Sequence, residues 1–197
     1  KLTTYRVMAE DAVDFALGAR AGVLSSVTAT TPLHGADGLE AMRRVAPGLG
    51  AARGWSTERV SHLLARYGSA ITEVAELIDA DPSLGEPLAA APQYLRAEVA
   101  YAVTHEGALQ VADVLARRVR LAIESRDRGL AALSEVLEII APLLGWDEED
   151  VAREEASWRE TCAAHEEALA AATDAGAARA RSVAKDREIG DGVRRLV

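Results

Sequence analysis

Residues 95–109 have the sequence LRAEVAYAVTHEGAL, in which apolar side chains recur at the three- and four-residue spacing of an α-helix. Four of them share one helix face: Leu95, Val99, Ala102 and Val103. The stretch continues into DVLARR at residues 113–118, for which the pattern also predicts a helix. Because the same periodicity recurs on both sides, we predict an all-α fold, an irregular helical bundle.

Further helices are predicted where apolar periodicity follows a capping residue and stops at glycine or proline. They cover residues 3–22, 39–45, 56–67, 69–78, 125–140 and 147–169. We expect the second of these to stop before Pro47 and Pro142 to kink or end the fifth. Three prolines make residues 81–92 irregular, and Val119–Ile123 is compatible with an extended segment.

The chain has four predicted parts. Residues 1–22 form a first helix, and residues 23–38 form a linker rich in Ser, Thr and Gly. Residues 39–175 form the main helical domain. Residues 176–197, with weak periodicity, form a helical or frayed tail.

Composition excludes several classes of protein. Hydrophobic residues make up 49% of the 197 residues and aromatic residues only 4%, which favours closely packed helices over a β-sandwich. The net charge of −9 argues against a nucleic-acid-binding surface. One cysteine, Cys162, excludes an internal disulfide and fits a reducing compartment. We find neither an apolar run long enough to cross a membrane nor the apolar core of a signal peptide.

Short motifs give no catalytic or metal site. Residues 48–54, GLGAARG, approach a dinucleotide fingerprint but lack the preceding strand, so we interpret them as a loop between helices. The four histidines lack the partners that a zinc site needs. Cys162 and His165 lie on the apolar stripe of the helix over 147–169, which indicates a buried, inert thiol and a packed or boundary histidine.

Two segments resemble FAD-dependent glycerol-3-phosphate dehydrogenases. The central segment resembles the core of that family's C-terminal helical domain in six residues: Tyr101, His105, Glu106, Asp113, Arg117 and Arg118. The opening sequence KLTTYR, residues 1–6, resembles the segment that closes the family's flavin-binding domain. The resemblance covers residues 1 to about 170, and implies the C-terminal domain of a two-domain flavoenzyme whose FAD-binding domain lies elsewhere in the polypeptide.

The resemblance implies roles for these residues. Residues 1–22 would be the last helix of the absent FAD-binding domain. Lys1, Leu2, Thr3 and Thr4 would border the flavin, as the start of this helix aimed at the ring. The six central residues would form a semi-buried network that joins helices; the alternative is a substrate-phosphate site at Arg117 or Arg118. No residue of this chain would be catalytic.

The same resemblance implies the chemistry of the parent enzyme. It would oxidise sn-glycerol 3-phosphate to dihydroxyacetone phosphate, with electrons passing to FAD and then to quinone, or to oxygen in the oxidase branch. The fragment alone would be inactive and bind no cofactor. The parent would be cytoplasmic. The resemblance is compatible with a homodimer and with peripheral association of the parent with the cytoplasmic face of the membrane. The alternative is a stand-alone α-helical protein-interaction module.

Overall fold

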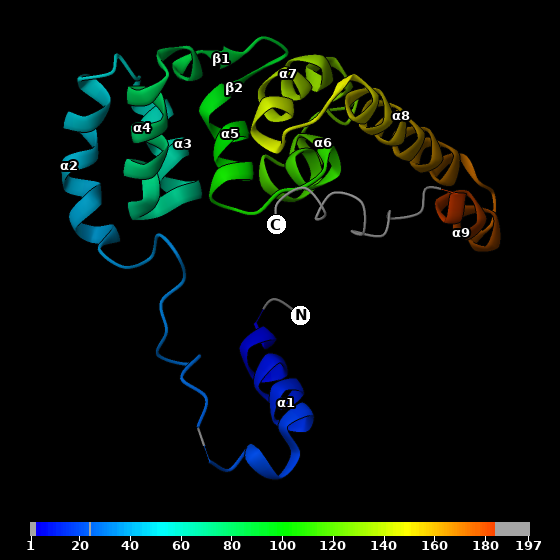
Figure 1. Ribbon diagram of the computed structural model, residues 1–197, viewed down its shortest axis with the longest axis horizontal. Helices are drawn as coiled ribbons and strands as arrows, with labels where there is room; N and C mark the ends of the chain where they lie inside the picture. Colours follow the sequence, from blue (N-terminus) through cyan, green and yellow to red (C-terminus); the bar gives the residue numbers. More distant parts are fainter. Residues whose placement is uncertain (1–2, 24, 184–197) are drawn as a thin grey trace. The chain divides into compact units, whose positions relative to one another are not determined.

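The computed structural model describes residues 3–23 and 25–183, and most of these residues are helical (Figure 1). The all-α prediction is confirmed. The α-helices are α1 Tyr5–Leu17, α2 Leu39–Ala51, α3 Thr57–Tyr67, α4 Ile71–Ala80, α5 Arg96–Thr104, α6 Leu121–Glu124, α7 Leu133–Leu144, α8 Glu148–Ala170 and α9 Asp174–Val183. Short 3-10 turns occur at η1 Gly18–Arg20, η2 Gly68–Ala70, η3 Pro82–Gly85 and η5 Leu130–Ala132, and η4 Asp113–Arg118 is a π-helix. The chain divides into two compact units, Lys1–Ile71 and Thr72–Val197.

In the first unit, helix α2 runs straight through Pro47. The prediction that this helix stops before the proline is therefore wrong, and so is the loop predicted over residues 48–54, because α2 continues to Ala51. Proline removes one helical hydrogen bond, but packing against α3 buries Ala46 and Gly50 on the same helix. A Cβ atom at Gly50 would clash with Cγ2 of Val60, so glycine allows the two helices to approach closely.

Two glycines tie the end of the linker to the end of α3. Gly35 and Gly68 both have positive φ, and the Ser69 amide donates to the Gly35 carbonyl at 2.8 Å. A Cβ atom on either residue would collide with backbone, of Tyr67 in one case and of Gly35 in the other. As predicted, Ser56 caps α3, accepting a hydrogen bond from the Arg59 amide, and Gly68 ends it.

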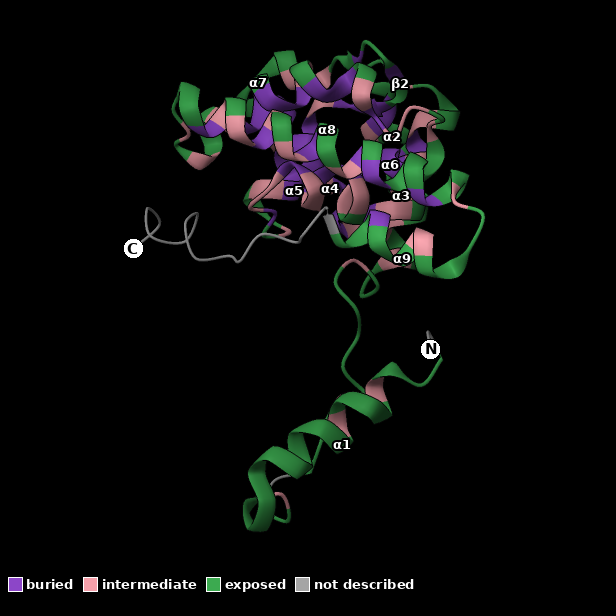
Figure 2. Cartoon of the chain, turned by 90° about the vertical axis from the view of Figure 1, so that its right-hand side faces the viewer, coloured by how far each residue is buried: buried purple, intermediate pink, exposed green. Residues whose placement is uncertain are grey.

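Helix α1 has no buried residue, and Figure 2 shows it coloured as exposed over almost its whole length. Its large apolar side chains are accessible along the helix, from Leu17 at 44% to Phe15 at 90% exposure. The helix ends at Leu17, earlier than predicted, because Gly18 adopts a positive φ and closes the last turn.

The second unit contains one continuous apolar core centred on α5. Six consecutive residues of α5, from Ala97 to Ala102, are buried, as expected for a helix surrounded by other elements. Helix α5 packs against α7 and η4, and α7 packs against α8. The largest fully buried side chains of this core include Tyr94, Leu115, Leu121, Leu133 and Ile140.

Residues 81–92 are more regular than predicted. Strands β1 Pro87–Leu88 and β2 Ala91–Leu95 form a short antiparallel ribbon that leads directly into α5. The ribbon tolerates its prolines because it has only two strands, so each strand has one edge at which its backbone groups pair with no other strand. The Arg96 amide donates to the Glu86 carbonyl at 2.9 Å, which fixes the start of α5 beside β1.

Two more local predictions are wrong in this unit. Val119–Ile123 is not extended: it leads into α6, which buries Leu121 and Ala122 in the core. Pro142 does not break α7, which continues to Leu144 and ends at Gly145 in the left-handed conformation. Beyond Pro142, Leu144 packs partly buried against the core, whereas Leu143 is exposed.

Asp147 caps α8 as predicted, through a hydrogen bond from the Asp150 amide at 2.9 Å. The buried face of α8 begins at Asp150 and Glu154 and includes, as expected, Trp158 and Cys162. His165 is exposed, which excludes the packed alternative predicted for it. Beyond Cys162 the buried residues of α8 are Ala164 and Ala168, because this part of the helix packs against α9 on a side that does not include His165.

Candidate functional site: the polar network around α5 and η4

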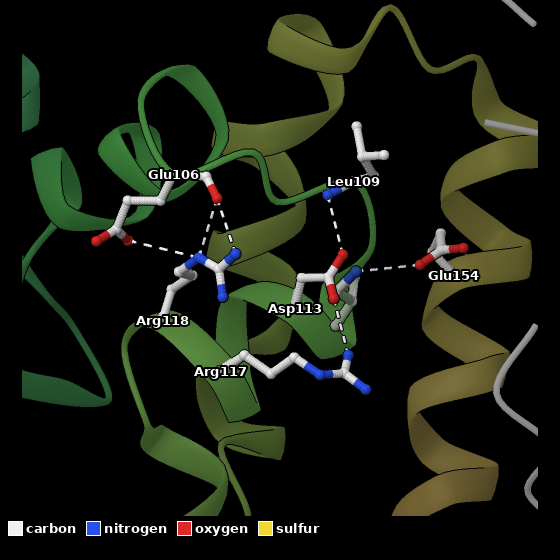
Figure 3. A network of polar contacts seen from close by, with 7 residues as sticks. Glu106, Leu109, Asp113, Arg117, Arg118 and Glu154 are labelled. Carbon is white, nitrogen blue, oxygen red and sulfur yellow. Dashed lines mark hydrogen bonds and ion pairs between the residues drawn. The ribbon is translucent and has the colours of Figure 1, made fainter. Parts of the chain in front are cut away.

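Arg118 joins the end of η4 to the end of α5 (Figure 3). Its guanidinium donates from Nε and Nη2 to the backbone carbonyl of Glu106, at 3.1 and 2.8 Å. The Glu106 carboxylate is a more distant partner, with Oε2 at 3.8 Å from Nε. Glu106 follows the last turn of α5, where backbone carbonyls lack helical partners and a cation is favourable. Arg118 therefore acts as a side-chain cap on α5.

Asp113 organises the start of η4. Its Oδ2 accepts a hydrogen bond from the Leu109 amide at 3.0 Å, and its Oδ1 pairs with Arg117 Nη1 at 2.7 Å (Figure 3). The ion pair lies within one helical element, and the Arg117 side chain is 49% exposed. Such a pair contributes little to stability, about 0.5 kcal/mol. The hydrogen bond from the Leu109 amide is therefore the more constraining contact of Asp113.

Tyr101 and His105 stack on one another along α5. Their ring centroids are 4.5 Å apart with an interplanar angle of 7°, and the His105 Nδ1 lies 2.7 Å from the Thr104 hydroxyl. The Tyr101 hydroxyl donates to Glu73 Oε2 on α4 at 2.6 Å. Burial, together with this carboxylate, raises the pKa of Tyr101 above its ordinary range. Tyr101 therefore stays a neutral donor at physiological pH.

The structure brings all six predicted network residues into one region. The amides of His105 and Glu106 both donate to the Tyr101 carbonyl, which connects the stacked rings to the Arg118 cap. The arrangement holds no nucleophile paired with a base, and its best-defined bonds are to backbone groups. The observed contacts connect η4 to the end of α5 and α5 to α4.

Two carboxylates that the sequence analysis missed complete this region. Glu154 of α8 is 8% exposed and accepts a hydrogen bond from the Val111 amide at 3.1 Å (Figure 3). Glu135 of α7 accepts from the Ala89 amide at 2.9 Å and pairs with Arg96 at 2.7 Å. These pairs link elements about 40 positions apart. The only signal for them in the sequence was an acidic residue on an otherwise buried helix face.

The opening residues are only partly described. Lys1 and Leu2 lie outside the described residues, whereas Thr3 and Thr4 immediately precede α1. The first helical bond of α1 runs from the Met8 amide to the Thr4 carbonyl, and the Thr4 hydroxyl donates to the Met8 sulfur at 3.7 Å rather than capping a backbone amide.

Over residues 3–23 and 25–183, His, Cys, Asp and Glu side chains form no group of three that could bind a metal ion. In the same segments no helix has both the length and the apolar character of a membrane span. Cys162 is buried as predicted, and burial raises the pKa of its thiol.

Comparison with known proteins identifies the family. Residues 26–151 match the family described as the C-terminal domain of alpha-glycerophosphate oxidase. The chain belongs to this family. The match covers the six network residues and Glu135 but ends before Glu154, and it confirms the resemblance carried by the central segment.

The relatives of this domain are glycerol-3-phosphate dehydrogenases. The domain is 48% identical over 159 residues to glycerol-3-phosphate dehydrogenase 2 of Mycobacterium tuberculosis, covering 80% of this chain but 27% of that protein. It is 46% identical over 159 residues to the Mycobacterium leprae enzyme, with the same coverage. Identity to a mitochondrial enzyme of Arabidopsis thaliana is 36% over 163 residues, or 75% of this chain and 25% of that protein. No solved structure matches the chain.

Proposed function

We propose that this chain is the C-terminal accessory helical domain of an FAD-dependent sn-glycerol-3-phosphate dehydrogenase. The parent enzyme would oxidise glycerol 3-phosphate to dihydroxyacetone phosphate and pass electrons through FAD to quinone. The observation that carries the proposal is the 48% identity over 159 residues to a glycerol-3-phosphate dehydrogenase of which the chain spans only 27%. The family description, a C-terminal domain, supports the same assignment.

In this proposal the start of α1 borders the flavin, which would serve as the hydride acceptor. The described residues at this end fit an anionic partner. Because the Thr4 side chain makes no capping bond to the backbone, the amides of the first turn of α1 keep their donors directed ahead of the helix. Lys1 and Leu2 would complete the border, with Lys1 adding a positive charge.

The other roles follow from the same assignment. The FAD-binding domain of the same polypeptide would be the main partner, and the exposed apolar side chains of α1, such as Phe15 and Val7, offer it a surface. The polar network around Arg118 would hold the helices of this domain together and take no part in the reaction. We place the parent in the cytoplasm, peripherally at the membrane face where quinone is reduced, with oxygen as the alternative acceptor. The net charge of −9 disfavours nucleic-acid binding by this domain.

A domain exchange tests the proposal. The corresponding C-terminal segment of the M. tuberculosis relative would be replaced by this chain, and the chimera compared with a truncated enzyme that ends before the segment. We expect the chimera to keep its FAD absorbance and its glycerol-3-phosphate:dye reductase activity, and the truncated enzyme to lose both. The isolated chain should be folded by far-UV circular dichroism but bind no FAD.

Two results would contradict the proposal. Stoichiometric FAD binding or turnover by the isolated chain would show that it is more than an accessory domain. If the isolated chain folds but the chimera is no more active than the truncated enzyme, the result favours the stand-alone interaction module instead.

A further inference from the structure

The second unit contains a cavity of about 260 Å³ that the network described above does not explain. Its walls come from η4, from α6, from the turn around Arg128 and from the middle of α8. Alanines and the Trp158 ring make much of this wall apolar. The volume falls slightly below the usual range of ligand-binding pockets, about 300–1,000 Å³, so a small molecule would fill it.

A buried donor in the wall of this cavity lacks a partner. Trp158 is 4% exposed, and within the described part of the chain its indole Nε1 makes no hydrogen bond. A buried donor without a partner destabilises the fold relative to one that is hydrogen-bonded. This destabilisation is removed if a molecule in the cavity presents an acceptor.

The charged groups of the cavity favour a negative ligand. Arg117 and Arg128 both line it. Arg117 Nη1 pairs with Asp113, whereas the Arg128 side chain makes no hydrogen bond or ion pair with another described residue. The neighbouring Asp127 carboxylate is occupied by the amides of Gly129 and Ala131. Arginine side chains bind carboxylate and phosphate oxygens in a planar, two-pronged geometry.

We propose that this cavity binds a small organic anion, a phosphate monoester or a carboxylate carried on a compact apolar body. The anionic group lies between Arg128 and Arg117, one of its oxygens accepts the Trp158 indole N–H, and the apolar body packs against Ala116 and Ala122. The inference goes beyond the proposed function, because it involves neither the flavin nor the oxidation of glycerol 3-phosphate.

Titration of the ¹⁵N-labelled chain tests the inference through the indole N–H signals of its three tryptophans, with Trp158 assigned from the Trp158→Phe variant. The probes are phenyl phosphate and benzoate, which distinguish the two anionic groups, with phenol and inorganic phosphate as controls that each lack one half. We expect at least one of the two anions to shift the Trp158 signal saturably. Phenol and inorganic phosphate should bind at least tenfold more weakly.

Variants separate a built site from general attraction by charge. Arg128→Gln should weaken binding about tenfold, the equivalent of about 1.4 kcal/mol. Arg126→Gln removes a charge from an exposed position two residues away and should leave the affinity unchanged. Trp158→Phe replaces the indole by a smaller aromatic ring without a donor, and should weaken binding several-fold when followed through the backbone amides of Ala116 and Ala122.

Three outcomes would overturn the inference. The first is that neither anion shifts the Trp158 signal. The second is that Arg126→Gln weakens binding as much as Arg128→Gln. The third is that inorganic phosphate binds as tightly as phenyl phosphate. None of these readouts depends on enzyme turnover, so failure here leaves the assignment to glycerol-3-phosphate dehydrogenase untouched.

Discussion

Arg118 binds the backbone carbonyl of Glu106 more closely than it binds the Glu106 carboxylate. Two donors of the guanidinium lie at 3.1 and 2.8 Å from the carbonyl oxygen, and the nearest carboxylate oxygen is at 3.8 Å. Both side chains are about one-third exposed. Any side chain at position 106 would present the same carbonyl, so the connection between η4 and α5 depends on Arg118 far more than on the acid.

This relationship predicts unequal effects of two substitutions. Arg118→Met should lower the free energy of unfolding by about 1.5–3 kcal/mol, since it removes charge-assisted bonds to the end of α5. Glu106→Gln should cost less than about 1 kcal/mol, since it weakens only a partly exposed ion pair. Urea denaturation of both variants measures the difference, with Arg120→Met, at an exposed position, as the control. A Glu106→Gln variant less stable than Arg118→Met would show that the carboxylate dominates.

Glu135 should matter more than any other carboxylate on α7. Its two oxygens serve Arg96 and the Ala89 amide, joining α7 to both the ribbon and the start of α5. Glu135→Ala should lower the free energy of unfolding by about 1–3 kcal/mol, because it leaves a half-buried guanidinium and an amide without this partner. Glu138→Ala, one turn along the exposed face of the same helix, is the matched control. Equal effects of the two substitutions in thermal denaturation would contradict the bridging role.

The hydrogen bond from Tyr101 to Glu73 predicts a pH dependence. Burial and the carboxylate raise the pKa of Tyr101, so the folded protein retains a proton that the unfolded chain releases near pH 10. The stabilisation by the hydroxyl is therefore fully present below pH 10 and decreases as the pH rises further. Tyr101→Phe should cost about 1–2 kcal/mol at pH 7, and this difference should shrink above pH 10.

Chemical denaturation between pH 7 and pH 11 checks this behaviour. Tyr5→Phe changes an exposed ring and serves as the control. A gap between wild type and Tyr101→Phe that stays constant across the range would mean that the hydroxyl ionises equally in the folded and unfolded states.

The sequence predicted the elements whose signals are local. Ser56 and Asp147 cap their helices through the next turn, and Gly68 ends α3 by its own backbone conformation. The central six residues were found because they lie close together along the chain. Lys1 and Leu2, by contrast, lie outside the described residues, and their role at the flavin remains a proposal.

The features that could not be predicted depend on distant partners. Glu135 with Arg96, Glu154 with Val111 and Tyr101 with Glu73 join positions 28 to 43 residues apart, for which spacing gives no signal. Pro47 was misjudged for the same reason. Its local cost is outweighed by burial against α3, a contact that exists only once the two helices have packed.

Two glycines of α2 provide a test of that packing. Gly48 and Gly50 lie two residues apart in the same helix, but a Cβ atom at Gly48 meets nothing within 4 Å and one at Gly50 would clash with Val60. Gly48→Ala should raise stability by about 0.5–1 kcal/mol, because alanine is the better helix former. Gly50→Ala should lower stability by about 1–3 kcal/mol, because the added methyl group overpacks the contact between α2 and α3.

Combining Gly50→Ala with Val60→Ala should recover part of that loss relative to the sum of the two single substitutions, since the new methyl then occupies the space that Val60 vacates. Hydrogen exchange of the α2 and α3 amides measures the effect in the first unit itself. Equal stabilisation by both alanines would mean that α2 does not pack against α3 through Gly50.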